Sequence, residues 1–175
     1  MKTALTIAII GSISFSSLAH MNDNQNEYAS SPKTILTESY AQKTQPDFEK
    51  GITRHIVLFD LKEGVTQQQK QEIVNRFLAL KNSKRNGEFY IENIEVGAKN
   101  ISKEGQGKGY DLAFIVSFTS KGNLNYYVGT PAISDSDYFD NNHQKFKDFV
   151  GPLLKVGKNT DGSDYVGVLV FDYQL

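Results

Sequence analysis

One segment constrains the fold of this chain more than any other feature. The stretch His55-Ile56-Val57-Leu58-Phe59-Asp60-Leu61 is rich in β-branched and aromatic residues, which favour an extended strand. Because side chains alternate across a strand, every second residue shares one face: His55, Val57, Phe59 and Leu61. Ile56 and Leu58 lie on the other face, so both faces are largely apolar and both must be covered. Helices can cover one face, whereas the other needs a second sheet, most simply from a second copy of the chain.

A helix is predicted soon after this strand. Thr66 and Gln69 have the spacing of a capping box, in which the hydroxyl and the amide satisfy free backbone N–H groups at the start of a helix. Apolar residues then recur at helical spacing and form one stripe: Ile73, Val74, Phe77, Leu78 and Leu80. Asn86-Gly87 ends this helical segment.

The remaining elements complete the order β-α-β-β-α-β. Further strands are predicted over residues 91–96, 110–118 and 165–173. Ser120 is placed to cap a short extra helix, and a longer helix is predicted over residues 139–156. This order is that of the ferredoxin-like α+β fold, an antiparallel four-stranded sheet with helices on one face. We expect one domain over residues 51–175.

The N-terminus has the layout of a secretory signal peptide. Lys2 precedes an apolar stretch from Ala4 to Phe15, and Ser17-Leu18-Ala19 supplies the small residues that a signal peptidase reads. The alternatives are a membrane anchor and a buried helix, but the stretch is shorter than the roughly 20 residues that span a bilayer. We therefore predict a signal peptide over residues 1–19, export to the periplasm or the medium, and no membrane association after cleavage.

Residues 20–50 are predicted to form a flexible polar leader. They are rich in Asn, Gln, Ser, Thr and Glu, and the pairs Ser31-Pro32 and Gln45-Pro46 disfavour a continuous helix. The alternative is that Ile35-Leu36 and Tyr40 dock on the surface of the domain.

Composition excludes several classes of function. The chain has no cysteine, which excludes disulfides, a lipid anchor on a cysteine and thiol chemistry. With 19 basic and 20 acidic residues it lacks the positive charge that nucleic-acid binding needs. Gly105, Gly107 and Gly109 do not form a phosphate loop, because no Gly-Lys-Ser/Thr follows and a strand rather than a helix comes next. No cofactor and no metal site are predicted.

Three further segments carry a resemblance to a known family. Tyr127-Val128-Gly129-Thr130-Pro131-Ala132, continued after an interruption by His143-Gln144-Lys145-Phe146, resembles the Tyr and His-Pro-x-His-x-x-Phe pattern of the stress-responsive α/β-barrel (Dabb) family. The turn Gly109-Tyr110-Asp111 and the closing Val-Phe-Asp-Tyr at residues 170–173 are also similar to that family. The resemblance covers roughly residues 54–173. It implies a dimeric α/β barrel, in which two sheets pack face to face, and hence a homodimer through the sheet face.

His143 and Tyr127 are the candidate catalytic residues. An apolar stripe with helical spacing includes His143, where an imidazole is either a hydrogen-bonded core group or an acid/base in a pocket. The resemblance implies the second role, because His143 matches the base of the polyketide-cyclising members and Tyr127 matches the phenol that stabilises the substrate oxygen. The alternative for Tyr127 is an aromatic core residue, and Tyr126 replaces it if the helix has a different phase.

A ligand pocket is expected between the sheet and the helices. Its predicted lining residues come from the strands and helices around His143: His55, Val57, Phe59, Phe77, Leu112, Phe114 and Phe146. The alternative for His55 is a half-exposed residue at the end of a strand, bonded to a neighbouring carboxylate.

The sequence departs from the family pattern at three places. Thr130 stands where the family has the first His of its motif, and Leu112 replaces another pocket His. Residues 133–142 form an insertion between the two halves of the motif, and its acidic residues include Asp135, Asp137 and Asp140. We expect a solvated loop there; the alternatives are a lid over the pocket and a site for a divalent cation.

Two functions fit these features. The first is an exported stress-response-type module that binds a small apolar or aromatic molecule without catalysis. The second is a cofactor-free cyclase or lyase that acts on a poly-ketone, with His143 as general base and Tyr127 as oxyanion partner. A third, oxidation of haem or of aromatics as in related dimeric-barrel monooxygenases, has no haem-ligand pattern beyond His143 to support it.

Overall fold

The computed structural model describes residues 40–175 of the chain. The predicted signal peptide (1–19) and residues 20–39 of the predicted leader lie outside the described residues. Within residues 40–175, none of the helices combines the length and the apolar composition that a membrane span requires.

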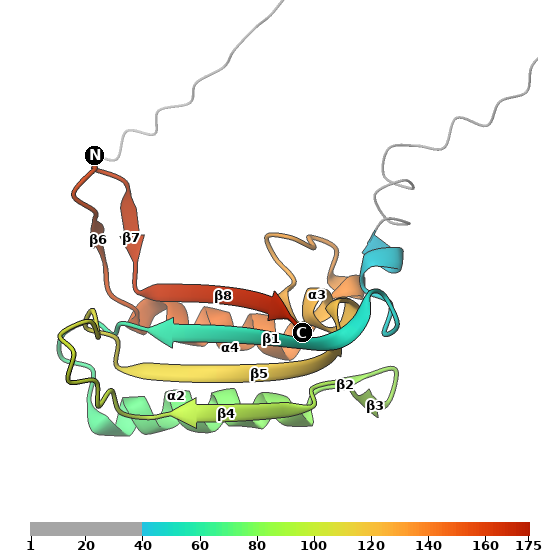
Figure 1. Cartoon of the computed structure of the whole chain (residues 1–175), viewed down its shortest axis with the longest axis horizontal. Helices are drawn as coiled ribbons and strands as arrows, with labels where there is room; N and C mark the ends of the chain where they lie inside the picture. Colours follow the sequence, from blue (N-terminus) through green and yellow to red (C-terminus); the bar gives the residue numbers. More distant parts are fainter. Residues whose placement is uncertain (1–39) are drawn as a thin grey trace, which may run out of the picture.

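A four-stranded antiparallel sheet lies at the centre of the domain (Figure 1). Its strands, in spatial order, are β4 (Asn93–Gly97), β5 (Leu112–Ser120), β1 (Lys50–Phe59) and β8 (Val168–Gln174). The central strand β1 pairs with both β5 and β8. With helices after β1 and after β5, this is the predicted ferredoxin-like α+β plan, which is confirmed.

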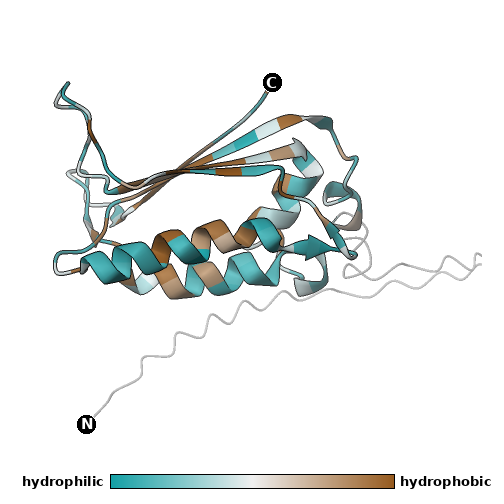
Figure 2. Ribbon diagram, turned by 90° about the horizontal axis from the view of Figure 1, so that it is seen from below, coloured by the Kyte–Doolittle hydropathy of each residue, from teal (hydrophilic) through white to brown (hydrophobic). Residues whose placement is uncertain are grey.

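Three α-helices pack on one face of the sheet: α2 (Gln67–Ala79), α3 (Lys121–Val128) and α4 (Asn141–Val150). Figure 2 shows α2 and α4 side by side beneath the sheet, with their apolar positions directed towards it. The capping box predicted at the start of α2 is present, since Thr66 and Gln69 exchange hydrogen bonds of 2.9 and 3.2 Å. The hydroxyl of Ser120 caps α3 by accepting from the backbone N–H of Asn123.

The core lies between these helices and the inner face of the sheet. An aromatic cluster from four elements fills its centre: Phe59, Phe77, Phe114 and Phe146. The rings of Phe77 and Phe114 stack with centroids 3.8 Å apart. Leu78 was predicted to belong to the buried stripe of α2 but is exposed, because it lies on the flank of the helix away from the sheet.

The later elements differ from the prediction in their bounds. The last helix was predicted over residues 139–156, but α4 begins only after Asp140, whose side chain accepts from the N–H of Asn142. It ends at Val150, because Pro152 cannot continue the hydrogen bonding of a helix, and the short 3₁₀ turn η3 (Gly151–Leu153) follows. The predicted strand 165–173 divides at Gly167 into β7 (Asp164–Val166) and β8.

Two hairpins and two further 3₁₀ turns complete the fold. β6 (Val156–Lys158) and β7 form a hairpin that extends away from the sheet (Figure 1). β2 (Lys84–Arg85) and β3 (Glu88–Phe89) form a smaller hairpin around Asn86-Gly87, where the sequence analysis had recognised only the end of a helix. The remaining 3₁₀ turns are η1 (Leu80–Asn82) and η2 (Ser136–Tyr138).

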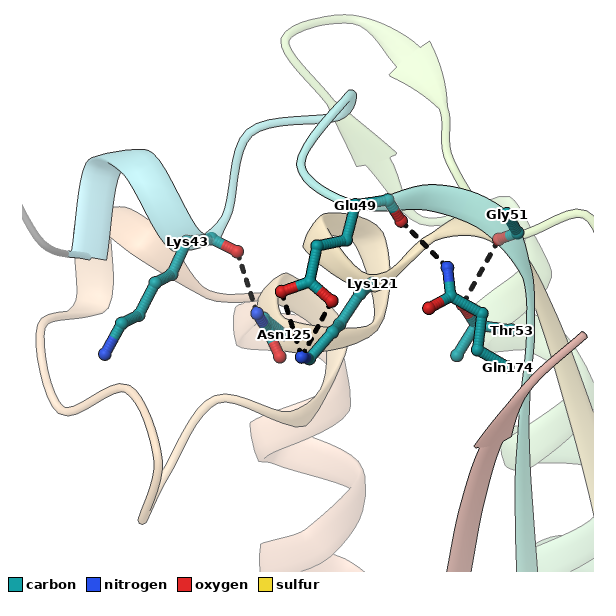
Figure 3. Close-up of polar contacts among 7 residues, drawn as sticks. All are labelled: Lys43, Glu49, Gly51, Thr53, Lys121, Asn125 and Gln174. Atoms are coloured by element: carbon teal, nitrogen blue, oxygen red, sulfur yellow. Dashed lines mark hydrogen bonds and ion pairs between the residues drawn. The ribbon is translucent and has the colours of Figure 1, made fainter.

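Residues 40–49, here called the N-terminal strap, pack on the domain (Figure 3). The amide of Asn125 in α3 donates to the carbonyl of Lys43 over 2.8 Å, and Lys121 forms an ion pair with Glu49. The Tyr40 and Ser134 hydroxyl oxygens lie 3.1 Å apart, and the Thr44 side chain is fully buried. The predicted flexible leader therefore does not extend to residue 50. Tyr40 docks on the domain, as one part of the alternative proposed, whereas Ile35 and Leu36 lie outside the described residues.

The strap depends on a close approach to α3. A Cβ added to Gly122 would lie 1.7 Å from the carbonyl oxygen of Gln45, so only glycine leaves room for the strap at this point. No polar pattern within residues 40–49 predicts this contact. It arises because the start of α3 lacks a side chain.

The outer face of the sheet is apolar and open. The antiparallel register places Ile56 of β1 between Ile115 and Phe171, and Leu58 beside Leu169. The side chain of Phe171 is 59% exposed, and no helix or strand of residues 40–175 covers this face. The register therefore agrees with the expectation that both faces of β1 are apolar. The outer face is the one that no element of the described residues covers.

Candidate functional site

A cavity of about 400 Å³ lies between the inner face of the sheet and the helices. This volume is within the range of roughly 300–1,000 Å³ that is usual for small-molecule sites. Most of the wall is apolar, from β1, α2, α4, β8, the end of α3 with the segment after it, and the residue after η3: Val57, Phe59, Phe77, Val128, Pro131, Phe146, Val150, Leu154, Val168 and Val170. Five polar side chains also reach it: His55, Thr130, His143, Lys147 and Asp172.

Most of the predicted pocket residues lie on this cavity, but two do not. His55, Val57, Phe59, Phe77 and Phe146 are all part of its wall. Phe114 is fully buried behind Phe77, whose stacked ring separates it from the cavity. Leu112 lies at the far end of β5, opposite Phe59, and is part of the packed core. Strand alternation gave the correct face for both residues, but packing against other core residues keeps both of them away from the cavity.

His143 is buried in the cavity wall with one nitrogen held by the backbone. Its Nδ1 lies 2.6 Å from the carbonyl oxygen of Tyr127. Because a carbonyl oxygen only accepts, Nδ1 carries the proton and Nε2 keeps its lone pair. The pKa of His143 is lowered to about 3, mainly by burial and to a smaller extent by the nearby Lys147 and His55, against the raising effect of the hydrogen bond to Tyr127. The imidazole is therefore neutral at neutral pH.

Tyr127 packs against both histidines but does not line the cavity. Its ring stacks on His143 with centroids 3.8 Å apart and meets His55 edge-on at 5.4 Å. The hydroxyl is buried without a hydrogen-bond partner among the described residues, and burial raises the pKa of this phenol well above its usual value. This is the environment of an aromatic core residue, which was the alternative interpretation. The atom of Tyr127 that acts on His143 is its backbone carbonyl.

Tyr126 does not replace Tyr127 at the cavity. Its ring lies 4.7 Å beneath the guanidinium carbon of Arg85 and contacts Tyr90 edge-on. These contacts are on the side of α3 that faces the β2–β3 hairpin.

His55 and Asp172 form a pair across β1 and β8. They are register partners, and His55 Nδ1 donates to the carboxylate of Asp172 over 2.6 Å. The neighbouring carboxylate matches one alternative for His55, but the ring is only 5% exposed and lines the cavity. Asp172 was not among the residues predicted from the sequence. The family-like Val-Phe-Asp-Tyr ending was the available signal, although it gave no reason to place that carboxylate against His55.

Lys147 is a cavity residue that the sequence analysis missed. It follows His143 by one helical turn on α4, so that both side chains leave the same face of the helix. Its Nζ donates to the carbonyl oxygens of Thr130 and Val128 over 2.8 and 3.0 Å. Thr130, which stands in place of the family's first motif His, donates through its hydroxyl to Gln144 over 2.6 Å. The i+4 spacing from His143 was the signal that would have found Lys147.

The insertion 133–142 does not cover the cavity, because none of its residues lines it. It folds back on the domain through buried Ile133 and Phe139. Asp140 accepts from the Tyr90 hydroxyl and donates its backbone N–H to the carbonyl of Tyr126, which brings the chain back to α4. Among residues 40–175 no group of three or more acidic or histidine side chains is arranged to hold a metal ion.

Fold and cavity together define an α+β protein with a ferredoxin-like sheet and an apolar cavity between that sheet and its helices. The chain belongs to the family of the Stress responsive A/B Barrel Domain (Dabb), whose model matches residues 53–175. This confirms the resemblance on which the site residues were chosen. Among curated proteins, none matches this sequence.

Solved structures show the same fold. The protein At3g17210 from Arabidopsis thaliana is 24% identical, with a TM-score of 0.51 over 70% of this chain and 94% of that one. The hydroxynitrile lyase of Passiflora edulis is 17% identical, with a TM-score of 0.51 over 72% and 94%. A dimeric ferredoxin-like protein of unknown function from Jannaschia sp. is 18% identical, with a TM-score of 0.50 over 71% and 100%. At these identities the likeness shows the fold alone.

Proposed function

We propose that this protein is an exported, stress-response-type Dabb protein that binds a small apolar or aromatic molecule between its sheet and its helices. The observation that carries the proposal is the apolar cavity of about 400 Å³, with a few polar groups converging on it. Export is supported by the signal-like residues 1–19 of the sequence.

If the cavity binds a ligand, that ligand should stabilise the wild type but not a variant whose cavity is filled by a larger side chain. A ligand present at about 100 times its dissociation constant stabilises the folded state by roughly 2.7 kcal/mol. We expect an apolar or aromatic compound from a broad panel to raise the melting temperature of the wild type. Val170→Phe, which places a ring at the edge of the cavity, should abolish the shift.

The control is Val96→Phe, which adds the same ring on β4 at a residue that does not line the cavity. It should keep the ligand-induced shift. If no compound stabilises the wild type, or if both variants respond like the wild type, the cavity is not a binding site.

We further propose a homodimer that closes the open face of the sheet. The support is the apolar outer face, with Phe171 at 59% exposure, since contiguous exposed apolar patches mark interaction surfaces. The family and the dimeric relative of the same fold agree with this assembly.

If the protein is a dimer through this face, introducing one charged residue there should separate the subunits. Phe171→Asp would bury an unpaired carboxylate between two apolar sheets, at a cost of several kcal/mol. Light scattering at micromolar concentration should show a dimer for the wild type and a monomer for this variant. Phe89→Asp is the control, because Phe89 is similarly exposed at 62% but lies on the β2–β3 hairpin. A monomeric wild type would contradict the proposed assembly.

A cofactor-free cyclase or lyase is the second candidate, and one observation favours it. The hydrogen bond from Nδ1 to the Tyr127 carbonyl leaves the lone pair of His143 Nε2 available as a proton acceptor in a residue that lines the cavity, and the lowered pKa of about 3 makes it a weak one. One solved relative in fold is a hydroxynitrile lyase, at 17% identity. The buried hydroxyl of Tyr127 gives no support to its proposed role as oxyanion partner.

A further inference from the structure

One basic residue of the cavity wall has no ion-pair partner among the described residues. Lys147 is half-buried and lines the cavity together with apolar side chains such as Phe146 and Val150. Among the described residues no carboxylate lies within ion-pair distance of its ammonium group. A cation in an apolar wall is costly unless it finds a partner, so its place in the wall calls for an explanation.

The backbone positions this ammonium group without neutralising it. Two of its three N–H donors are taken by the carbonyl oxygens of Thr130 and Val128, at 2.8 and 3.0 Å. The nearest further acceptor is the hydroxyl oxygen of Thr130, at a longer distance of 3.4 Å. The end of α3 and the following segment therefore hold Nζ in place, and one donor remains weakly used.

The other ionisable groups of the cavity wall already have hydrogen-bond partners of their own. Asp172 is the acidic residue of the wall, and its carboxylate accepts the N–H of His55 at 2.6 Å rather than a donor of Lys147. His143 is buried and donates its single N–H to the backbone. Lys147 is thus a charged residue of the wall with no carboxylate within ion-pair distance among the described residues.

We propose, on the basis that this cavity is the binding site proposed above, that Lys147 makes it selective for apolar carboxylates and binds their head group. The carboxylate accepts the remaining N–H of Lys147, and the hydrocarbon part lies against Val57, Phe146 and Val150. A hydrogen bond between two charged groups is about twice as strong as a neutral one, so a carboxylate is favoured over an alcohol or a ketone of the same size.

Three probes with the same alkyl chain test this selectivity: decanoate, decan-1-ol and decylamine. Calorimetry on the full chain should show that the wild type binds decanoate about tenfold more tightly than decan-1-ol, and decylamine most weakly. Lys147→Met keeps a long apolar side chain and removes the charge. It should lower the affinity for decanoate about tenfold and leave that for decan-1-ol unchanged.

Lys145→Met is the matched control, since it removes the same charge from an exposed residue of α4 that does not line the cavity. It should bind all three probes like the wild type. If Lys147→Met does not fold, the ranking of the three probes on the wild type decides. Equal affinity for decanoate, decan-1-ol and decylamine overturns the role of Lys147 while the proposed binding function stands. If none of the three binds, the binding function fails and this inference fails with it.

Discussion

Replacing Gly167 with alanine is expected to lower the free energy of unfolding by about 3 kcal/mol or more, the upper range for overpacking a tight site. Gly167 joins β7 to β8 where three backbone segments meet. Its N–H donates to the carbonyl of Lys155 over 2.6 Å, and its carbonyl accepts from the N–H of Asp60 over 2.9 Å. A Cβ at this position would lie 2.1 Å from the carbonyl oxygen of Asp60. Because this obstacle is backbone, it cannot rotate away, and the sheet edge or the hairpin must move.

The control for this substitution lies in the same hairpin. Gly157 in β6 has no atom within 4 Å of an added Cβ, so Gly157→Ala should change stability little. Urea unfolding monitored by circular dichroism compares the two variants with the wild type. Two equal and small changes would show that the junction at Gly167 is looser than the packing indicates.

The second large effect is a loss of stability in acid that depends on His143. Its pKa in the folded protein is lowered from 6.5 to about 3, mainly by burial, so protonation favours the unfolded state. The stabilisation is fully present above pH 6.5 and is lost as the pH falls towards 3. By pH 4.5 the wild type should lose about 2.5 kcal/mol through this group.

His143→Gln removes the titrating ring and keeps an N–H for the Tyr127 carbonyl. Its unfolding free energy should therefore fall less steeply between pH 7 and 4.5 than that of the wild type, by about 2 kcal/mol. Phe146→Leu, which destabilises the same core without removing a titratable group, should keep the slope of the wild type. Identical slopes for all three proteins would mean that His143 is not held neutral in the fold.

The same glutamine variant separates the two proposed functions. A base is essential to a cyclase or lyase, so His143→Gln should abolish turnover of a poly-ketone substrate. Binding of an apolar ligand does not require a base and should survive the substitution. Turnover that persists in this variant would remove His143 as the base.

Features that depend on near neighbours in the chain were predicted well. The capping box of Thr66 and Gln69 and the cap of Ser120 join residues three positions apart, so the pattern contains the whole interaction. The alternation of β1 likewise gave the two apolar faces, and the order of elements gave the ferredoxin-like plan. Lys147 could also have been predicted from local spacing, because it follows His143 by one helical turn, but this spacing was not used.

Contacts between distant segments were not predictable in the same way. Asp172 reaches His55 only because β8 pairs with β1, 117 positions away in the chain. The family motif indicated the phenol of Tyr127 as a functional group, but packing against Phe118, His55 and His143 buries that hydroxyl and leaves the carbonyl to act. Phe114 was placed on the correct face, yet the ring of Phe77 separates it from the cavity.

Periodicity and capping over a few residues are enough to specify the α+β class, the apolar faces of the first strand and the position of His143 on a buried helical stripe. The tertiary structure decided which side chains enclose empty space, where Asp172 and Lys147 meet that space, and that Gly122 and Gly167 must stay small. These depend on the register of strands and on side-chain volume across the core, which no local pattern of residues specifies.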